Sequence, residues 1–541
     1  MQLSEREVAD SASIQAALSA NAALVFWLDV ADRSGGVQEH WGCVVRRDGE
    51  PHWERLPGTG DGKAWTKSDI ERAKELRTVL SGAVSATEVQ TLVHVVREQR
   101  LDPLLKHLDG VQTLYVVGAG EMAGVPAEVL APEYTISYVP SGTLLARMSK
   151  RPKLESSGLL ALGDPVFGKK GALSTPPSTT LPPGGLLVQQ VVPGRTAANA
   201  GLRPGDVLVR YGETSLNGVG ELGAAIASQT PAKSISLAVW RECEKELLKL
   251  DAAPGKLGIG LHPKPAPEAI AERREADAML LTVRGGDWKD LPGTRTEVAQ
   301  FQKLLGKDAT VLLDSAASEQ SLEQLRNNGD LSRFRYLHFA THGEPNSVLE
   351  FESALILAQD QIPETPLPKA GEPFLNGQLS AREVLDFWKL DAELVTLSAC
   401  ETALGRQGGG DGFLGFAQAF LTAGSRAVCL SLWKVDYTAT SLLMTRFYQN
   451  LLGKRLGLEA PMPKAVALAE AKSWLRNLSQ EEAAALAVAA GQGVIRGERG
   501  KGETLKLVVR PSEPAPAPKP ADKPFAHPRF WSAFILIGDP N

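Results

Sequence analysis

A repeated alternation of short apolar runs with helical segments is the feature that most restricts the fold of this chain. Between the apolar runs, apolar residues recur at helical spacing over 68–108, 142–149, 413–423 and 438–452. Parallel strands need long crossovers, which are usually helical. The alternation therefore predicts an α/β fold with a mostly parallel sheet and helices on both faces. Runs of strand length lie at 22–30, 40–46, 112–118, 158–163, 278–284, 309–313, 335–340, 393–399, 426–432 and 533–537.

A second, separate domain interrupts this pattern. Residues 169–184 are rich in Gly, Ser, Thr and Pro, a composition that predicts a linker. A β-rich stretch follows at 185–261, and a polar stretch at 262–277 leads out of it. We therefore expect a small domain inserted into a surface loop between two halves of the α/β fold, at 1–168 and 278–541.

Two long segments break the second half, at 359–378 and 453–524. The first is rich in Pro and Gly. The second ends in PSEPAPAPKPADKP. This composition does not supply a packed core, so we predict a loop at its end.

Composition excludes several function classes. The chain has 541 residues, a formal net charge of −5 and a pI near 6.0, which gives no basic surface for nucleic acid. No apolar run is long enough to span a membrane, and the start, MQLSEREVADS, does not resemble a secretory signal. The four cysteines are widely separated, without the paired spacing of a zinc site. We expect a cytoplasmic protein that needs no metal or organic cofactor, and no phosphate-binding loop indicates a nucleotide.

Polar residues follow three of the expected strands at the same relative place. His342 follows the run 335–340, Cys400 follows 393–399, and Asp436 lies shortly after 426–432. In an open parallel sheet, the carboxyl ends of the strands line one edge, where ligand sites form. If these strands are neighbours, the three side chains converge on one crevice.

A thiol and an imidazole in one crevice indicate nucleophilic catalysis. His342 would take the proton of Cys400 and later give it to the leaving amine. The backbone N–H groups of Gly343 and Cys400 would stabilise the developing oxyanion. The alternative is structural, since a cysteine at a strand end is often a small buried apolar residue and a histidine in an apolar run is often a satisfied core residue. Cys43 and Cys429 fit that alternative well.

Several segments resemble the CHAT domain of the caspase-like, clan CD cysteine peptidases. The segments are LHFATHGE, LVTLSACETALG, GGGDGFLGFAQAFLTAGSRAVCLSLWKVD and FAHPRFWSAFILIGDP. Weaker sequence similarity at 108–130, 134–148, 159–168 and 291–306 extends the resemblance over nearly everything outside the insertion. The resemblance implies a caspase-like sheet whose first half is a pseudo-peptidase partner of the second, with His342 and Cys400 as the catalytic pair.

The same resemblance implies a pocket for the residue before the scissile bond, lined by Ser398, Trp433 and Asp436. An aspartate there would favour a basic side chain, although Asp436 is also suited to a surface turn or a helix cap. The chain departs from the family pattern at Ala403, at Tyr437 and after the histidine at 344–346. These departures weaken the prediction of specificity but leave the catalytic pair intact. The tetratricopeptide repeats common in front of such domains are not found in this sequence.

The inserted stretch resembles a PDZ domain of the bacterial protease type, through GLLVQQVVPGRTAANAGLRPGDVLVRYGE and GKLGIGL. The resemblance implies that the backbone N–H groups of Leu257, Gly258, Ile259 and Gly260 bind the carboxylate of a peptide, whose strand extends the sheet. A helix at 218–228 would form the other wall of the groove. A spacer with an occluded groove is the alternative.

These features together predict a cysteine peptidase that cleaves a protein, with the PDZ unit recognising a peptide C-terminus or an internal segment of a partner. By analogy with the family, the expected role is antiviral defence or regulated cell death in bacteria, with a gasdermin as one candidate substrate. A non-catalytic scaffold or sensor is the alternative. A hydrolase or transferase of small molecules is a third possibility, for which the sequence offers no nucleotide or phosphate motif.

Overall fold

The computed structural model contains two compact units. The larger comprises Met1–Phe167, Lys289–Glu364 and Leu375–Asn541, and the smaller comprises Gly168–Trp288 and Thr365–Phe374. Within the chain the structure describes residues 8–31, 37–82, 84–149, 151, 154–167, 181–192, 194–228, 234–241, 246–271, 288–346, 350–360, 362, 373, 375–399, 415–434, 436–489, 494–495, 508–509 and 523–541.

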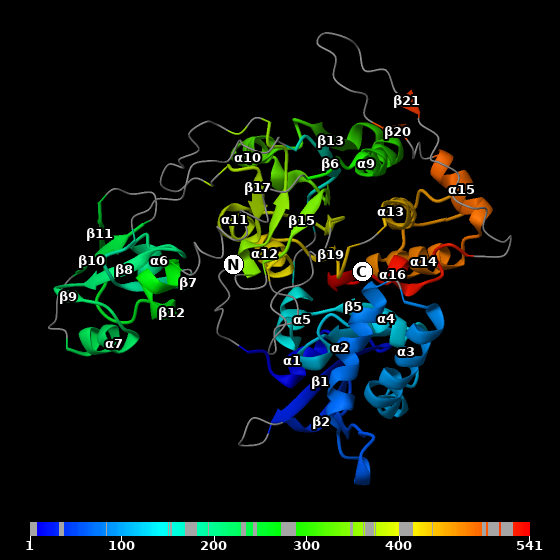
Figure 1. Cartoon of the computed structure of the whole chain (residues 1–541), viewed down its shortest axis with the longest axis horizontal. Coiled ribbons are helices and arrows are strands. Elements are labelled where there is room, and N and C mark those ends of the chain that lie inside the picture. The colour runs from blue at the N-terminus through cyan, green and yellow to red at the C-terminus, as the bar shows by residue number, and fades with distance from the viewer. Residues whose placement is uncertain are drawn as a thin grey trace. The chain divides into compact units, whose positions relative to one another are not determined.

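The larger unit is built on an eleven-stranded sheet (Figure 1). Seven of the neighbouring pairs are parallel, and the antiparallel ones are β19–β22, β1–β2 and β2–β3. In spatial order the strands are β13 (Ala309–Asp314), β6 (Leu159–Pro165), β14 (Tyr336–Ala340), β18 (Leu394–Leu397), β19 (Ala427–Ser431), β22 (Phe534–Gly538), β5 (Thr135–Tyr138), β4 (Thr113–Val117), β1 (Ala22–Ala31), β2 (Val37–Arg46) and β3 (His52–Arg55). The mostly parallel α/β sheet predicted from the sequence is confirmed.

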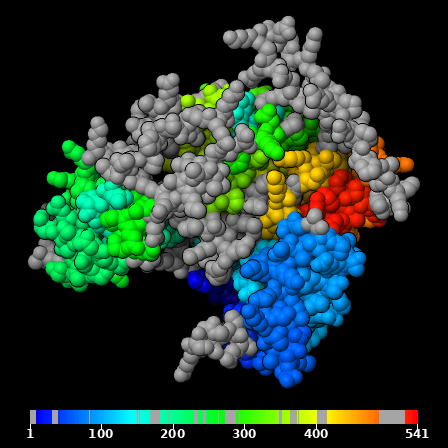
Figure 2. Space-filling view, in the orientation of Figure 1, coloured from blue at the N-terminus to red at the C-terminus, as the bar shows by residue number. Residues whose placement is uncertain are grey.

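Nine of the ten predicted strands belong to this sheet, and the tenth, 278–284, lies outside the described residues. The sequence analysis missed β5, a four-residue strand that contains Thr and Ser. This strand matters because β22 pairs with β19 on one side and with β5 on the other, which joins the two halves of the unit. Figure 2 shows the C-terminal segment, in red, directly beside the blue first half.

Helices cover the sheet, and the predicted helices at 68–108, 142–149, 413–423 and 438–452 are confirmed in their described parts. The α-helices of the larger unit are α1 (Ser11–Ala16), α2 (Lys67–Ser81), α3 (Ala86–Arg100), α4 (Ala127–Leu130), α5 (Gly142–Met148), α9 (Pro292–Leu305), α10 (Glu319–Asn327), α11 (Ala381–Phe387), α12 (Phe416–Ala423), α13 (Tyr437–Leu451), α14 (Lys464–Asn477), α15 (Gln480–Ala489) and α16 (Pro528–Trp531). The 3-10 turns are η1 (Asp61–Lys63), η2 (Asp102–His107), η3 (Gly120–Met122), η4 (Gly306–Asp308), η5 (Leu331–Arg333) and η6 (Glu350–Glu352).

The long segment 453–524 holds more structure than its composition indicated. It contains α14 and α15, and α14 buries Ala467, Leu468, Ala471 and Leu475. These positions repeat at helical spacing, so the helix packs one apolar face into the core. A two-stranded ribbon, β20 (Val494–Ile495) with β21 (Val508–Val509), follows. The Pro-rich end at 511–522, predicted to be a loop, lies outside the described residues.

A small antiparallel sheet continues from the end of β14. After Thr341 the chain enters β15 (His342–Glu344), which pairs with β16 (Ala354–Ile356), and β16 pairs with β17 (Gln378–Ser380). Thr341 is buried, and its hydroxyl donates to the carbonyl of Ile356. Thr341 therefore follows a strand of the large sheet and is hydrogen-bonded to a strand of the small sheet, which fixes its position.

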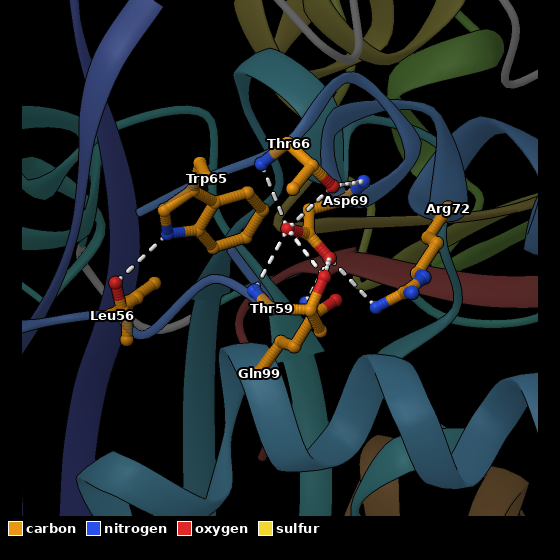
Figure 3. Close-up of polar contacts among 7 residues, drawn as sticks. All are labelled: Leu56, Thr59, Trp65, Thr66, Asp69, Arg72 and Gln99. Carbon is orange, nitrogen blue, oxygen red and sulfur yellow. Dashed lines mark hydrogen bonds and ion pairs between the residues drawn. The ribbon is translucent and has the colours of Figure 1, made fainter. Parts of the chain in front are cut away.

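A buried carboxylate organises the start of α2 in the first half (Figure 3). Asp69 accepts hydrogen bonds from the backbone and hydroxyl of Thr59 and of Thr66, from Gln99 and from Arg72. Burial raises the pKa of Asp69, but the hydrogen bonds from Thr59, Thr66 and Gln99 outweigh burial and hold this pKa well below its usual value. The carboxylate thus stays charged and joins the loop before α2 to both α2 and α3.

The smaller unit contains a six-stranded sheet and, within its described residues, helical segments at 196–199, 219–227 and 266–271. Its strands lie in the order β11 (Leu248–Ala252), β10 (Ile235–Trp240), β8 (Val207–Tyr211), β7 (Leu186–Val191) and β12 (Ile259–Pro265), and β9 (Thr214–Ser215) pairs with β8. The first two of these helices are α6 (Thr196–Asn199) and α7 (Val219–Ala227), and α7 confirms the helix predicted at 218–228. Ala266, Ala269 and Ile270 are also buried in this unit, so its packed core extends into the stretch predicted as a linker from 262.

In the parts of the chain that the structure describes, no helix combines the length and the apolar character needed to cross a lipid bilayer.

Candidate active site

The three strands expected to converge are direct neighbours. β14, β18 and β19 lie side by side, and both pairings are parallel. Phe339 pairs with Leu397, which pairs in turn with Leu430, so the carboxyl ends of the three strands lie level at one edge of the sheet. The ends of the three strands therefore lie side by side at one edge of the sheet, as the sequence predicted.

His342 lies at this edge, as the first residue of β15. Its Nε2 is 2.9 Å from the carbonyl oxygen of Lys289, and its ring is 5.1 Å from that of Phe167, centroid to centroid. A carbonyl oxygen only accepts hydrogen bonds, so Nε2 carries the proton in this contact. In the neutral imidazole the lone pair then belongs to Nδ1.

The surroundings of His342 favour its neutral form. Burial lowers the pKa of His342 below 6.5, the carbonyl of Lys289 opposes this effect, and the positive charge of Lys434 lowers the pKa further. A histidine with such a pKa is uncharged near pH 7 and is able to accept a proton.

Cys400 lies outside the described residues, but the two residues before it are held firmly. The backbone N–H of Ser398 donates to the carbonyl of Phe339 at 2.8 Å, which continues the ladder between β14 and β18. The carbonyl of Ala399 accepts a hydrogen bond from the hydroxyl of Ser431 on β19. Both Ser398 and Ala399 are buried. The chain thus reaches position 400 at a defined point of the sheet edge.

A narrow pocket of about 20 Å³ opens beside His342. Ser398 and Ala399 line it together with Tyr437 and Thr440 of α13 and with residues of α9. A cavity of this size has room for about one water molecule. The hydroxyl of Thr440 faces this region without a hydrogen-bond partner among the described residues.

The pocket also contains a buried acid that the sequence analysis missed. Glu297 of α9 lines the pocket at 1% exposure, and its Oε1 lies 2.8 Å from Nε2 of His338 on β14. His338 also lies 3.3 Å from the hydroxyl of Tyr448, through Nδ1. Two signals pointed to this pair: Glu297 lies beside the apolar positions Val298 and Phe301, and a histidine inside the apolar run 335–340 needs a partner.

The other residues predicted for the pocket are placed differently from Ser398. Asp436 is exposed and is the N-cap of α13, where its carboxylate accepts from the N–H of Ala439 at 2.9 Å. Trp433 is 5% exposed, and its indole N–H donates to the carbonyl of Arg529. Neither residue is among those that line the pocket beside His342. Gly343, proposed as an oxyanion donor, pairs with Leu355 in the small sheet.

The residues predicted to bind a peptide carboxylate lie at the start of β12 in the smaller unit. The carbonyl of Leu257 accepts from Ala197, and that of Gly258 accepts from Val192. Gly258 has a φ of +74°, and a Cβ there would lie 2.7 Å from Arg195, so only glycine suits this turn. Ile259 and Gly260 pair with β7, and β12 is the edge strand of the described sheet.

The described cysteines differ from a reactive thiol. Cys43 and Cys429 are buried, and burial raises the pKa of each to about 12. Such thiols are protonated at neutral pH and unreactive. Among the described residues, no group of three His, Cys, Asp or Glu side chains is arranged to hold a metal ion.

The fold and the edge site define an α/β protein with a large, mostly parallel sheet and a histidine pocket at the carboxyl ends of its central strands. The chain belongs to the CHAT domain family, whose model matches residues 90–539.

Tetratricopeptide repeat protein 28 is similar to part of this chain. The mouse protein (Mus musculus) is 25% identical over 276 residues, which cover 46% of this chain and 9% of the relative. The human protein (Homo sapiens) is 25% identical over 277 residues, with 46% and 8% covered. The chain thus spans less than a tenth of the length of these relatives.

Two solved structures are also similar. The separase–securin complex of Saccharomyces cerevisiae has 10% identity and a TM-score of 0.38, over 97% of this chain and 30% of that chain. The Arg-specific cysteine proteinase gingipain R has 8% identity and a TM-score of 0.34, over 87% of this chain and 73% of that chain.

The surroundings of His342 predict its titration. In a Cys400→Ala variant, in which no thiol at position 400 is present to couple with the histidine, histidine NMR should give His342 a pKa below 6.5. Lys434→Ala removes a charge that opposes protonation, so the pKa should rise, whereas Lys434→Arg should leave it nearly unchanged. A pKa that does not respond to Lys434→Ala would contradict the electrostatic contact.

Proposed function

We propose that this chain is a caspase-like cysteine peptidase in which Cys400 is the nucleophile and His342 the general base. One observation carries the proposal. Residues paired between β14 and β18 are separated by 58 positions in the sequence, as Phe339 and Leu397 are, and the same 58 positions separate His342 from Cys400. The two segments that follow β14 and β18 leave the sheet at the same level, so side chains at the start of each segment can contact one another. Membership of the CHAT domain family supports the same pair.

The reaction follows from the tautomer of His342. With Nε2 donating to Lys289, Nδ1 is the nitrogen that takes the thiol proton of Cys400. The sulfur then bonds to the carbonyl carbon of the peptide, and the C–N bond breaks as the imidazolium returns its proton to the leaving amine. Water, deprotonated by the same imidazole, hydrolyses the thioester and restores the thiol.

The developing oxyanion needs donors at the same edge. We assign this role to the backbone N–H groups of Gly343 and Cys400. Gly343 has no side chain to keep a substrate carbonyl away from its backbone. Losing one donor of this kind costs about 3 kcal/mol of transition-state stabilisation, which corresponds to a rate loss of about two orders of magnitude.

A thiol-directed probe tests the catalytic pair. An acyloxymethyl ketone peptide should label the wild-type chain at Cys400, and Cys400→Ala should abolish labelling. His342→Ala should slow labelling by about a hundredfold, because the thiol loses its base. Cys429→Ala is the matched control and should label at the wild-type rate, since the pKa of that buried thiol is about 12.

The same experiment separates the peptidase from its alternative, a scaffold or sensor that binds without turnover. The observation that favours the alternative is the narrowness of the pocket, with room for about one water molecule. A wild-type chain that is neither labelled nor able to cleave peptides would leave only the binding role, and labelling that survives in Cys400→Ala would contradict Cys400 as the nucleophile.

We further propose that the side chain before the scissile bond is basic, and that the pocket beside His342, which has room for about one water molecule in this structure, widens to receive its charged end. Two acidic residues are candidates to pair with it, Glu297 in the pocket and Asp436 at the start of α13. An exposed charge such as Asp436 contributes up to about 1 kcal/mol, because water screens it. A hydrogen bond to a buried charged group contributes about 1.5 to 3 kcal/mol. On these magnitudes Glu297 is the stronger determinant.

Paired substrates distinguish the two acids. Peptides with arginine or its neutral isostere citrulline before the scissile bond should differ at least tenfold in kcat/KM for the wild type. Glu297→Gln keeps the size of the side chain and a partner for His338, and should remove most of this preference. Asp436→Asn should change it less than fivefold. A larger loss of the preference in Asp436→Asn than in Glu297→Gln would instead identify Asp436 as the main determinant.

For the smaller unit, we propose that the edge of β12 binds the C-terminal strand of a partner peptide, as the resemblance to PDZ domains implies. The position of β12 at the edge of the described sheet supports this role. By family analogy the partner or substrate is a protein of bacterial antiviral defence or regulated cell death, with a gasdermin as one candidate, and the site of action is the cytoplasm.

Deleting residues 181–271 tests this division of labour. The deletion should abolish binding of a C-terminal peptide library measured by fluorescence anisotropy, while probe labelling of Cys400 stays within twofold. Peptides with an amidated C-terminus are the control and should bind the full chain at least tenfold more weakly. Unchanged peptide binding by the deletion would contradict the role of β12.

A further inference from the structure

A second pocket lies far along the sheet from His342, where the two halves of the larger unit meet. It is formed by α4 and β5 of the first half and by α14 and α16 of the second, which Figure 1 shows beside one another. Its volume is about 80 Å³. Ile136, Ala465 and Leu468 supply a buried apolar end.

The interior of this pocket contains one compensated charge. Lys472 is 4% exposed, and its Nζ lies 2.7 Å from Oε1 of Glu128. The other oxygen of Glu128 accepts from the hydroxyl of Tyr138 at 2.8 Å. Both oxygens of Glu128 are thus occupied, and this carboxylate has little capacity left for a second cation.

One turn further along α14, Arg476 brings a charge that is not compensated. Its guanidinium lies 5.3 Å from the ring of Trp531, which is 7% exposed. Among the described residues, Arg476 makes no ion pair or hydrogen bond, and neither does the hydroxyl of Ser473. A cation near a helix C-terminus has a modest stabilising role of its own. Contact with Trp531 on the pocket wall, however, holds this cation where a ligand would meet it.

The pocket therefore has an apolar end, at Leu468 and Ile136, and a cationic end, at Arg476. The charged side chains Lys472, Glu128 and Arg476 leave one net positive charge. The volume of about 80 Å³ limits the ligand to a small molecule. We propose that this pocket binds a small aliphatic carboxylate of about four carbons, with its carboxylate on Arg476 and Ser473 and its chain against Leu468 and Ile136.

A ligand of about six heavy atoms binds in roughly the millimolar range, which sets the scale of the test. Butyrate is the probe, and butyramide, of the same size but uncharged, is its matched control. In saturation-transfer NMR on the full chain, butyrate should bind saturably, and butyramide should bind at least tenfold more weakly. Sodium chloride is added to the butyramide samples at the concentration of the butyrate salt, so that both series have the same ionic strength.

Arg476→Gln should weaken butyrate binding at least tenfold, since the guanidinium is the uncompensated group. Arg47→Gln, on an exposed turn of the first half, is the control and should leave the affinity unchanged. Leu468→Ala should also weaken binding, by a smaller factor, through loss of the apolar wall. Equal binding of butyrate and butyramide, or an Arg476→Gln variant with wild-type affinity, would overturn the proposal.

A peptide C-terminus carries the same carboxylate chemistry, so a third ligand distinguishes the sources. A tripeptide ending in valine is larger than the pocket and should bind more weakly than butyrate. Tighter binding of the tripeptide than of butyrate would overturn the assignment to a small acid. These measurements use no peptidase substrate. Their outcome therefore does not depend on whether Cys400 and His342 are catalytic.

Discussion

The parallel register of β14, β18 and β19 is the constraint on which the candidate site depends. It brings residues far apart in the sequence to the same level of one sheet edge, and the hydrogen bond from Ser398 to Phe339 continues it beyond β18. A slip of one residue would exchange the side chains of the two faces of these strands, and because both faces are buried, it would disrupt the packing on each side of the sheet. The side chains that fix the fold therefore also fix where the histidine and the cysteine segments leave the sheet.

Neighbouring residues of one type have different roles because their surroundings differ. His338 and His342 belong to the same stretch of chain, but His338 is buried between Glu297 and Tyr448, whereas His342 borders an open pocket. Cys429 lies inside β19, where burial raises its pKa to about 12. Residue type alone therefore does not identify a reactive group, and burial with its partners decides.

Apolar runs predicted the central strands well, because β14, β18 and β19 are buried on both faces and need no polar alternation. β5 was missed since a four-residue strand with Thr and Ser carries too little apolar signal. The spacing predicted that Asp436 follows a strand, but the direction of its carboxylate depends on the start of α13, where Asp436 is the N-cap. Glu297 was missed, because its neighbours Val298 and Phe301 indicate a buried helix face, whereas only the packing of α9 on the sheet decides which of its side chains meets the pocket.

The C-terminal strand links the candidate site to the first half of the unit. β22 lies between β19 and β5, and the buried hydroxyl of Ser137 donates to the carbonyl of Gly538 at 2.9 Å. Without β22, the backbone of β19 would be an open edge in the middle of a buried sheet. The second half, with His342 and the residues before Cys400, is thus not a closed structure by itself. Its central strands are completed by β22, and β22 in turn pairs with β5 of the first half, which carries neither residue of the proposed catalytic pair.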